Sequence, residues 1–91
     1  MSIKVRIPGP LRRLTGGQEE VELSAASVGD CLSSLHERFP GMKERLFDEM
    51  GEVRRFINIY VNGEDVSFLE GLATLVKPGD EISIVPAVAG G

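Results

Sequence analysis

Two side chains offer the chemistry of a covalent catalyst, the thiol of Cys31 and the imidazole of His36, and each is the single copy of its residue type. A thiol becomes a strong nucleophile when a neighbouring imidazole accepts its proton. Positions five apart on a helix point in different directions, so a helix over this segment keeps the two groups apart. We expect Cys31 to be a small buried apolar residue and His36 to face solvent.

Paired carboxylates are the second candidate, because general acid–base catalysis needs titratable groups that converge on one substrate atom. Asp48-Glu49 and Glu64-Asp65 are direct neighbours in the chain, and adjacent side chains on a strand or helix diverge. Gly16-Gly17 lacks the following Lys-Ser/Thr of a phosphate-binding loop, so it reads as a turn. The sequence therefore predicts no enzyme active site, and the chain is expected to act as a carrier or co-substrate of partner enzymes.

The remaining reactive group is the carboxylate of Gly91. Val88, Ala89 and Gly90 precede it, and glycine has few backbone restrictions, so this tail suits an extended path into a narrow channel. Residues 87–91 span about 16 Å when extended. With a pKa of about 3.5 the carboxylate is an anion and a poor electrophile at neutral pH. It needs activation, most simply as an acyl adenylate made by an ATP-using partner, and then accepts either sulfur, giving a thiocarboxylate, or a lysine amine, giving an isopeptide.

Composition limits the other function classes. The 91 residues carry a formal net charge of −4 and are 42% hydrophobic, which fits one small globular domain and argues against nucleic acid as the principal partner. No apolar run is long enough for a membrane span and no signal peptide is recognisable, so a cytoplasmic location is expected. One cysteine and one histidine provide no disulfide, iron–sulfur or zinc site, and no bound cofactor is expected.

Two basic pairs, Arg12-Arg13 and Arg54-Arg55, stand out against the negative net charge. Such pairs are either solvated surface arginines or a contact patch for an acidic partner. The sequence leaves both interpretations open.

The first quarter of the chain predicts a hairpin. Every second residue from Ile3 to Ile7 is apolar and residues 20–23 alternate again, which is the period of half-buried strands. The prolines of Pro8-Gly9-Pro10 end the first strand, and we expect a loop from there to the paired glycines Gly16-Gly17. The two strands are expected to pair antiparallel.

The period then changes to that of an α-helix. Ser27 is a good N-cap, and Asp30 gives a capping-box-like start. Pro40-Gly41 ends the helix. The apolar residues that fall on one face are Val28, Leu32, Leu35 and Phe39.

The second half of the chain returns to strands. Residues 42–54 form a connection with a helical turn over residues 43–47. Residues 56–61 are rich in β-branched and aromatic types, which favours a strand, and Asn62-Gly63 is the preferred type I′ hairpin turn. The remaining segments are a short strand at 64–67, an irregular stretch at 68–76, a type II-like turn at 77–80 and a final strand at 82–85.

This order of elements predicts an α+β fold in which a mixed sheet wraps over one main helix. The final strand is expected to lie parallel to the first at the centre of the sheet, which is a β-grasp arrangement. We expect a β-grasp domain over residues 1–86 and an extended diglycine tail over residues 87–91.

Alternation also predicts a partner surface next to the tail. If Ile82 and Ile84 face the helix, Val85 faces outward together with Phe56 or Tyr60 of the neighbouring strand. An exposed apolar patch beside a reactive tail suits docking. The alternative is that residues 42–51 cover this patch.

Several motifs together resemble the ThiS/MoaD family of bacterial sulfur carrier proteins, which are relatives of ubiquitin. The resemblance covers nearly the whole chain, and within the family it is nearest to the branch that serves cysteine biosynthesis. The matching segments are Thr15-Gly16-Gly17-Gln18, Arg55-Phe56-Ile57-Asn58-Ile59-Tyr60-Val61-Asn62, Glu64-Asp65-Val66, Gly71-Leu72-Ala73-Thr74 and Ile84-Val85-Pro86-Ala87-Val88-Ala89-Gly90-Gly91.

The resemblance implies a ubiquitin-like β-grasp fold and a set of partners. An E1-like adenylyltransferase of the MoeB/ThiF type would adenylate Gly91, which is then converted to a thiocarboxylate. In the cysteine branch this group attacks a PLP-bound aminoacrylate on a cysteine synthase, and a JAMM-type zinc metalloprotease releases cysteine. Two alternatives remain: a molybdopterin synthase small subunit, although these tend to have Pro-Pro where this chain has Pro86-Ala87, and a ubiquitin-like modifier conjugated to lysines.

Overall fold

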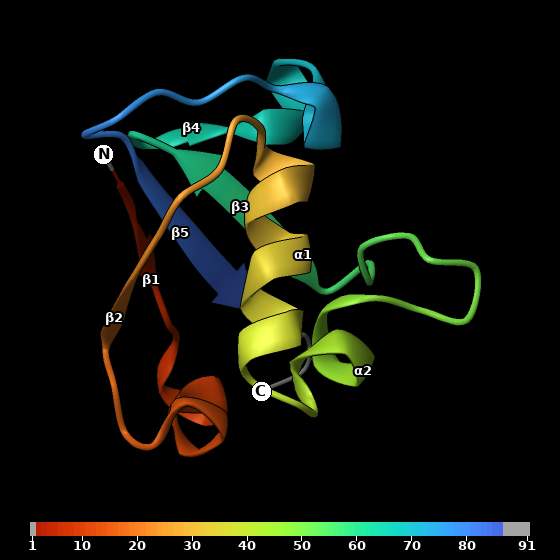
Figure 1. Ribbon diagram of the computed structural model, residues 1–91. Coiled ribbons are helices and arrows are strands. Elements are labelled where there is room, and N and C mark those ends of the chain that lie inside the picture. Colours follow the sequence, from red (N-terminus) through yellow and green to blue (C-terminus); the bar gives the residue numbers. More distant parts are fainter. Residues whose placement is uncertain (1, 87–91) are drawn as a thin grey trace.

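A computed structural model describes residues 2–86 of the chain. They form a five-stranded mixed sheet with the strand order β2-β1-β5-β3-β4, and one main helix, α1, packs across one face of it (Figure 1). The predicted α+β class and the β-grasp arrangement are confirmed. The strands are β1 (Ile3–Arg6), β2 (Glu20–Leu23), β3 (Ile57–Val61), β4 (Glu64–Asp65) and β5 (Glu81–Pro86).

The last strand lies at the centre of the sheet, as predicted. β5 pairs parallel with β1, where Val5 lies beside Ile82, and antiparallel with β3, where Ile59 lies opposite Ile84. β1 and β2 form the predicted antiparallel pair. Hydrogen bonds on both sides therefore hold β5 in place.

Helix α1 (Val28–Arg38) begins at the predicted cap. The Ser27 hydroxyl oxygen accepts a hydrogen bond from the Asp30 backbone N–H at 3.1 Å, and the Asp30 carboxylate accepts one from the Ala26 N–H at 3.0 Å. The side chains thus satisfy backbone donors that the first helical turn leaves without partners. Phe39 ends the helix in an extended conformation, one residue before Pro40.

The core lies between α1 and the inner face of the sheet. Alternate strand residues point into it, and the apolar stripe of the helix meets them. The residues of α1 and β5 that face the core are almost inaccessible to solvent. The main members of the core are Ile3, Val5, Val21, Leu23, Val28, Cys31, Leu32, Leu35, Ile57, Ile59, Val61, Ile82 and Ile84.

The predicted loop after β1 is a 3-10 helix, η1 (Gly9–Thr15). Pro10 has a fixed φ that suits a first helical turn, so the proline that ends the strand also starts the helix. The Leu11 N–H donates to the Pro8 carbonyl at 2.9 Å, and the Thr15 hydroxyl donates to the Arg12 carbonyl at 3.0 Å. The prediction of a loop here was wrong.

The hairpin after β3 forms with the predicted turn but a shorter second strand. Asn62 and Gly63 have φ values of 51° and 89°, the left-handed pair that a type I′ turn requires. β4 stops at Asp65 instead of Ser67, because the Asp65 carboxylate accepts a hydrogen bond from the Ser67 N–H at 2.8 Å. This bond bends the chain into the 3-10 turn η2 (Val66–Phe68).

The other connections are short helical turns. The turn predicted at residues 43–47 is α2 (Met42–Leu46), and the stretch predicted as irregular contains a 3-10 turn, η3 (Gly71–Ala73). Within residues 2–86, no helix is long and apolar enough to cross a membrane.

Candidate functional site

The candidate site is the end of the sheet at which β5 stops. The β5 arrow points toward the end of the molecule that carries α2 (Figure 1). The predicted sulfur-carrying and tail residues Gly91, Gly90, Ala89 and Val88 lie outside the described residues. They follow Pro86 by a few peptide bonds, so β5 fixes the point from which that segment starts.

The two neighbours of β5 pair with different parts of it, up to Pro86, the last described residue. The register of β1 with β5 covers Glu81 to Ser83, whereas the register with β3 continues to Pro86, which lies opposite Ile57. Proline has no N–H to extend the ladder. The end of β5 therefore projects past β1 and is held mainly by β3.

Of the proposed partner-binding residues, Val85 and Phe56 lie at this end, whereas Tyr60 lies farther along β3, next to β4. Val85 is 40% exposed and Phe56 is 48% exposed, while Tyr60 is half-buried. Val85 lies opposite Asn58, and Tyr60 lies opposite Ser83, so alternation places Val85 and Tyr60 on the outer face of the sheet. Residues 42–51 leave Val85 and Phe56 accessible.

Two surface hollows meet at Pro86. One, of about 520 Å³, lies between η1, α2 and the start of β3, and Phe56 forms part of its wall. The other, of about 290 Å³, lies between the end of β1 and the end of β5, and Val85 forms part of its wall. Arginines line both hollows: Arg45 and Arg54 the first, Arg6 and Arg12 the second.

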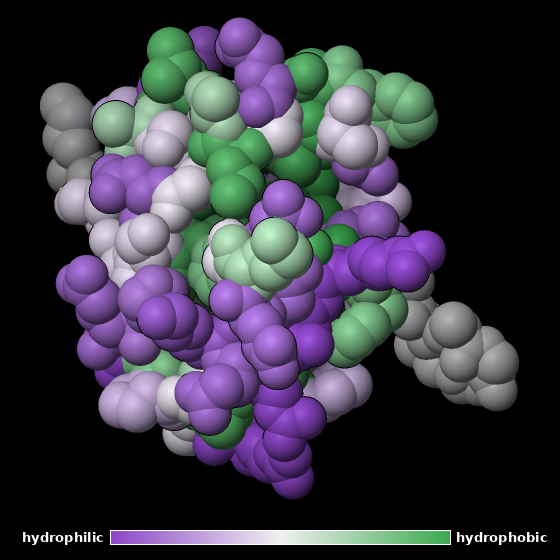
Figure 2. Space-filling model, turned by 90° about the vertical axis from the view of Figure 1, so that its right-hand side faces the viewer, coloured by the Kyte–Doolittle hydropathy of each residue, from purple (hydrophilic) through white to green (hydrophobic). Residues whose placement is uncertain are grey.

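A third hollow, of about 430 Å³, does not include Pro86 but shares Arg54 and Ile57 with the first hollow. Figure 2 looks onto the side of the molecule that carries the segment between α2 and β3, and hydrophobic surface is exposed in the upper half of that face. The apolar residues in the wall are Val53, Ile57, Ile59, Val66 and Leu72. The charged residues that line the hollow are Glu52, Arg54, Arg55 and Asp65.

Cys31 and His36 do not form a site. Cys31 is completely buried, and burial, with a smaller contribution from the charge of Asp30, raises the pKa of its thiol to about 12. His36 was predicted to face solvent but is half-buried, with its ring edge-on to Phe47 and the ring centroids 6.0 Å apart. The aromatic contact with the segment after α2 explains the difference.

The carboxylate pairs also have structural explanations. Asp65 caps the η2 turn, and hydrogen bonds from the Ser67 N–H and hydroxyl lower the pKa of its carboxyl group. Asp48 accepts hydrogen bonds from the N–H groups of Met50 and Glu52. Among residues 2–86, no three His, Cys, Asp or Glu side chains come together as a metal site.

The raised thiol pKa gives a testable pH dependence. The unfolded chain ionises Cys31 near its usual pKa of 9.0, whereas the folded chain keeps the proton up to about pH 12. The thiol's contribution to stability is therefore fully present below pH 9.0 and declines as the pH rises toward 12, by at most about 1.4 kcal/mol per pH unit. In urea titrations from about pH 8 to 11, the stability difference between the natural chain and Cys31→Ala should narrow with pH. Parallel curves would contradict the buried neutral thiol.

Comparison with known proteins gives the family. The model of the ThiS family matches residues 5–91. The chain belongs to the ThiS family. It is 48% identical over 93 aligned residues to the sulfur carrier protein CysO of Mycobacterium tuberculosis, and the match covers both chains completely. It is 40% identical over 91 residues to a putative sulfur carrier protein of Archaeoglobus fulgidus, again over both complete chains.

A solved structure supports the fold assignment of this ThiS-family chain. A chain in the crystal structure of the Amycolatopsis orientalis BexX/CysO complex superposes with a TM-score of 0.90 at 47% identity, covering 98% of this chain and 99% of that one. The ubiquitin-like β-grasp class expected from the resemblance is thereby confirmed.

Patterns in the sequence predicted some of the residues on the surface around Pro86 and missed others. Val85 was found because alternation identifies the outward positions of a strand, and Phe56, predicted as part of the strand, lies in the turn just before β3. Arg6 and Arg45 were not identified, since nothing in the local sequence shows that they line hollows next to Pro86. The packing of β1, α2 and β5, which are far apart in the chain, brings these arginines next to Pro86.

Proposed function

We propose that this ThiS-family chain is a sulfur carrier protein for cysteine biosynthesis and that the carboxyl group of Gly91 holds the sulfur. The observation that carries the proposal is the place of Pro86, at the end of the central strand and beside the exposed Val85 and Phe56. A rigid sheet thus presents the segment that ends in Gly90 and Gly91. The full-length similarity to CysO supports the same role for this chain.

The chemistry requires activation of the carboxylate. A carboxylate oxygen of Gly91 attacks the α-phosphorus of ATP and releases pyrophosphate, and the product is an acyl adenylate. A sulfur nucleophile then attacks the carbonyl carbon and displaces AMP, which leaves a thiocarboxylate. An E1-like adenylyltransferase of the MoeB/ThiF type supplies these steps and binds the ATP. The carrier contributes recognition and the tail, and holds no cofactor of its own.

The thiocarboxylate sulfur is a nucleophile at neutral pH. In the cysteine pathway it attacks the β-carbon of a PLP-bound aminoacrylate on a cysteine synthase. The thioester that results rearranges to an amide, and hydrolysis by a JAMM-type metalloprotease releases cysteine and restores the Gly91 carboxylate. This role places the carrier in the cytoplasm, where its ATP-using partner acts.

Docking is assigned to the apolar patch formed by Phe56, Tyr60 and Val85. Aromatic side chains with partly exposed rings are frequent anchors in protein interfaces. Phe56 and Val85 adjoin Pro86, so a partner that binds these two members of the patch has the start of the tail within reach.

Intact-mass measurement tests the proposal. The chain is incubated with ATP, a MoeB/ThiF-type enzyme and sulfide, and the expected product has gained the mass of one oxygen-to-sulfur exchange, located at Gly91 by fragmentation. A reaction without ATP is the control and should leave the mass unchanged. Higher-mass lysine conjugates in lysate would instead indicate a protein modifier, and restored activity of a molybdopterin synthase large subunit would indicate that pathway.

A further inference from the structure

One arginine of each basic pair is fixed against the main chain next to the end of β5. The Arg12 Nε–H donates to the Ile7 carbonyl at 3.0 Å, and the Arg54 Nε–H donates to the Glu44 carbonyl at 2.8 Å. Arg12 lines one of the hollows that meet at Pro86, and Arg54 lines the other. Because β1 and β3 are the two neighbours of β5, Arg12 after β1 and Arg54 before β3 lie on its two sides.

Within the described residues, the only hydrogen bond of each of these two guanidinium groups is the one from Nε–H. A guanidinium has five N–H donors, and the Nε–H bond uses one of them. Ion pairs among residues 2–86 involve Arg6 alone, which contacts Glu81 at 3.6 Å and Glu20 at 4.0 Å. Neither Arg12 nor Arg54 therefore has a carboxylate partner within the described part of the chain.

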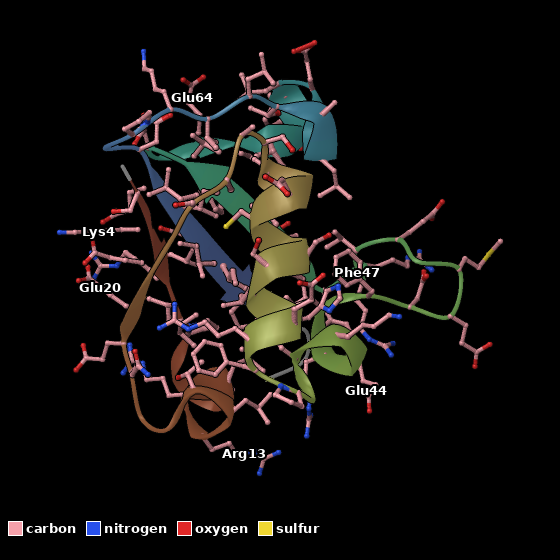
Figure 3. All side chains as sticks on the ribbon, in the orientation of Figure 1. Lys4, Arg13, Glu20, Glu44, Phe47 and Glu64 are labelled. Carbon is pink, nitrogen blue, oxygen red and sulfur yellow. The ribbon has the colours of Figure 1, made fainter. Side chains whose placement is uncertain are left out.

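The second arginine of each pair has a different environment. Arg13 and Arg55 are exposed, whereas Arg12 and Arg54 are half-buried. Arg13 points away from the body of the protein at the lower end of the molecule (Figure 3). The two arginines of each pair carry the same charge. They differ in whether the guanidinium group is held in a fixed orientation beside Pro86, and this difference matters for binding.

We propose that Arg12 and Arg54 form a guanidinium pair that binds two carboxylates on the rim of the channel through which the activating enzyme receives the tail. This inference rests on the proposed function, because it assigns the docking chemistry of the same site. The occupant of the site is an acidic protein surface with carboxylates on both sides of a channel entrance. The pair lies on the two sides of β5, because β1 and β3 flank that strand.

The geometry suits carboxylates for two reasons. The free edge of a guanidinium matches a carboxylate with two parallel N–H···O bonds, which a lysine does not reproduce. Since the Nε–H bonds already restrict both side chains, binding costs less conformational entropy than it does for a freely rotating arginine. Exposed Val85 and Phe56 lie in the same hollows and supply the apolar part of the contact.

The charge distribution also orients the partner. The chain as a whole has a net charge of −4, so an acidic partner is repelled from most of its surface. Glu64 lies at the end of the molecule opposite Arg13 (Figure 3). Among the described residues that line the two hollows at Pro86, Glu44 is the one carboxylate beside four arginines, Arg6, Arg12, Arg45 and Arg54. This local excess of positive charge favours one approach direction, which is how complementary charges give specificity.

The test compares four full-length variants, R12Q, R54Q and the matched neighbours R13Q and R55Q, for binding to a MoeB/ThiF-type enzyme. At about 50 mM salt, where screening is weak, R12Q and R54Q should each raise Kd about 10-fold or more, as expected for a lost hydrogen bond to a charged group. R13Q and R55Q should stay within about 2-fold. The effect of R12Q and R54Q should shrink at about 300 mM salt.

Two further variants separate binding from folding. R12K and R54K keep the charge but lose the planar fork, so they should recover only part of the affinity. Thermal unfolding of all six variants shows whether the loss of an Nε bond disturbs the domain, and Kd is compared at a temperature at which every variant is folded.

The outcomes distinguish this inference from the proposed function. If the natural chain is adenylated but R12Q and R54Q bind the enzyme with the same Kd as the natural chain, the proposal of a guanidinium pair is wrong. The proposed sulfur-carrier function is then unaffected. If all four Gln variants weaken binding to the enzyme equally, the attraction depends on total charge and not on two specific arginines. This result would also contradict the proposed guanidinium pair. If the natural chain is not adenylated at all, both proposals fail.

Discussion

Removal of Gly90 and Gly91 is expected to lower the rate of adenylation by the proposed E1-like partner at least about 100-fold. Two residues of extended chain span about 7 Å, so the new carboxylate on Ala89 cannot reach the α-phosphate of ATP when the domain is docked. A displacement of the reacting atom by even about 1 Å can reduce a rate 100-fold. ATP–pyrophosphate exchange in the presence of the carrier measures this step directly.

The same truncation should leave the stability of the domain and its affinity for the partner unchanged. These two measurements on the shortened chain are therefore the control for the loss of adenylation. The five paired strands and the core cluster described above lie within residues 2–86, so thermal unfolding should shift by less than about 2 °C. The shortened chain should bind the partner with nearly the same Kd and compete with the full chain. Undiminished exchange after truncation would show that the reactive carboxylate is not at Gly91.

Replacement of Ile82 by alanine should produce the largest loss of stability that a single core change causes here. Ile82 is completely buried in the central strand, beside Val5 of β1 and opposite Val61 of β3. Truncation of such a side chain removes apolar burial and leaves a cavity, at a cost of about 2–5 kcal/mol. For a domain of this size the unfolding midpoint should fall by at least about 8 °C, which calorimetry or chemical denaturation measures.

Ser83→Ala is the matched control for this prediction. Ser83 is the next residue of the same strand, on the opposite face and half-buried, so the change should stay within about 0.5 kcal/mol. A loss below about 1 kcal/mol for Ile82→Ala would mean that the central strand repacks easily, contrary to the close-packed core described above.

Much of the fold follows from local patterns in the sequence. Alternation gives the strands, Ser27 with Asp30 gives the start of α1, and Asn62-Gly63 gives the hairpin turn, because each signal concerns residues close in the chain. The 3-10 helix after β1 was missed because proline both ends a strand and starts a helical turn. The shortened β4 was missed because a single side-chain bond from Asp65 competes with strand pairing.

The surface around the tail is harder to derive. The sequence shows Arg12-Arg13 and Arg54-Arg55 as equivalent basic pairs, separated by about half the chain. Which member of each pair is fixed depends on whether its Nε reaches the carbonyl of Ile7 or Glu44. Those contacts depend on the paths of η1 and α2, and no local pattern determines them.

The central place of β5 has a consequence for how the chain is made. A ribosome synthesises β5 after all the other strands, yet β1 and β3 are joined in the sheet only through it. The pairing of Val5 with Ile82 is a contact of long sequence separation, the kind that makes folding slow. Until β5 emerges, the edges of β1 and β3 that will pair with it stay unpaired in the nascent chain and exposed to chaperones and proteases. The five-stranded sheet therefore forms only after synthesis has reached Pro86. Partners that recognise the folded sheet do not bind unfinished chains.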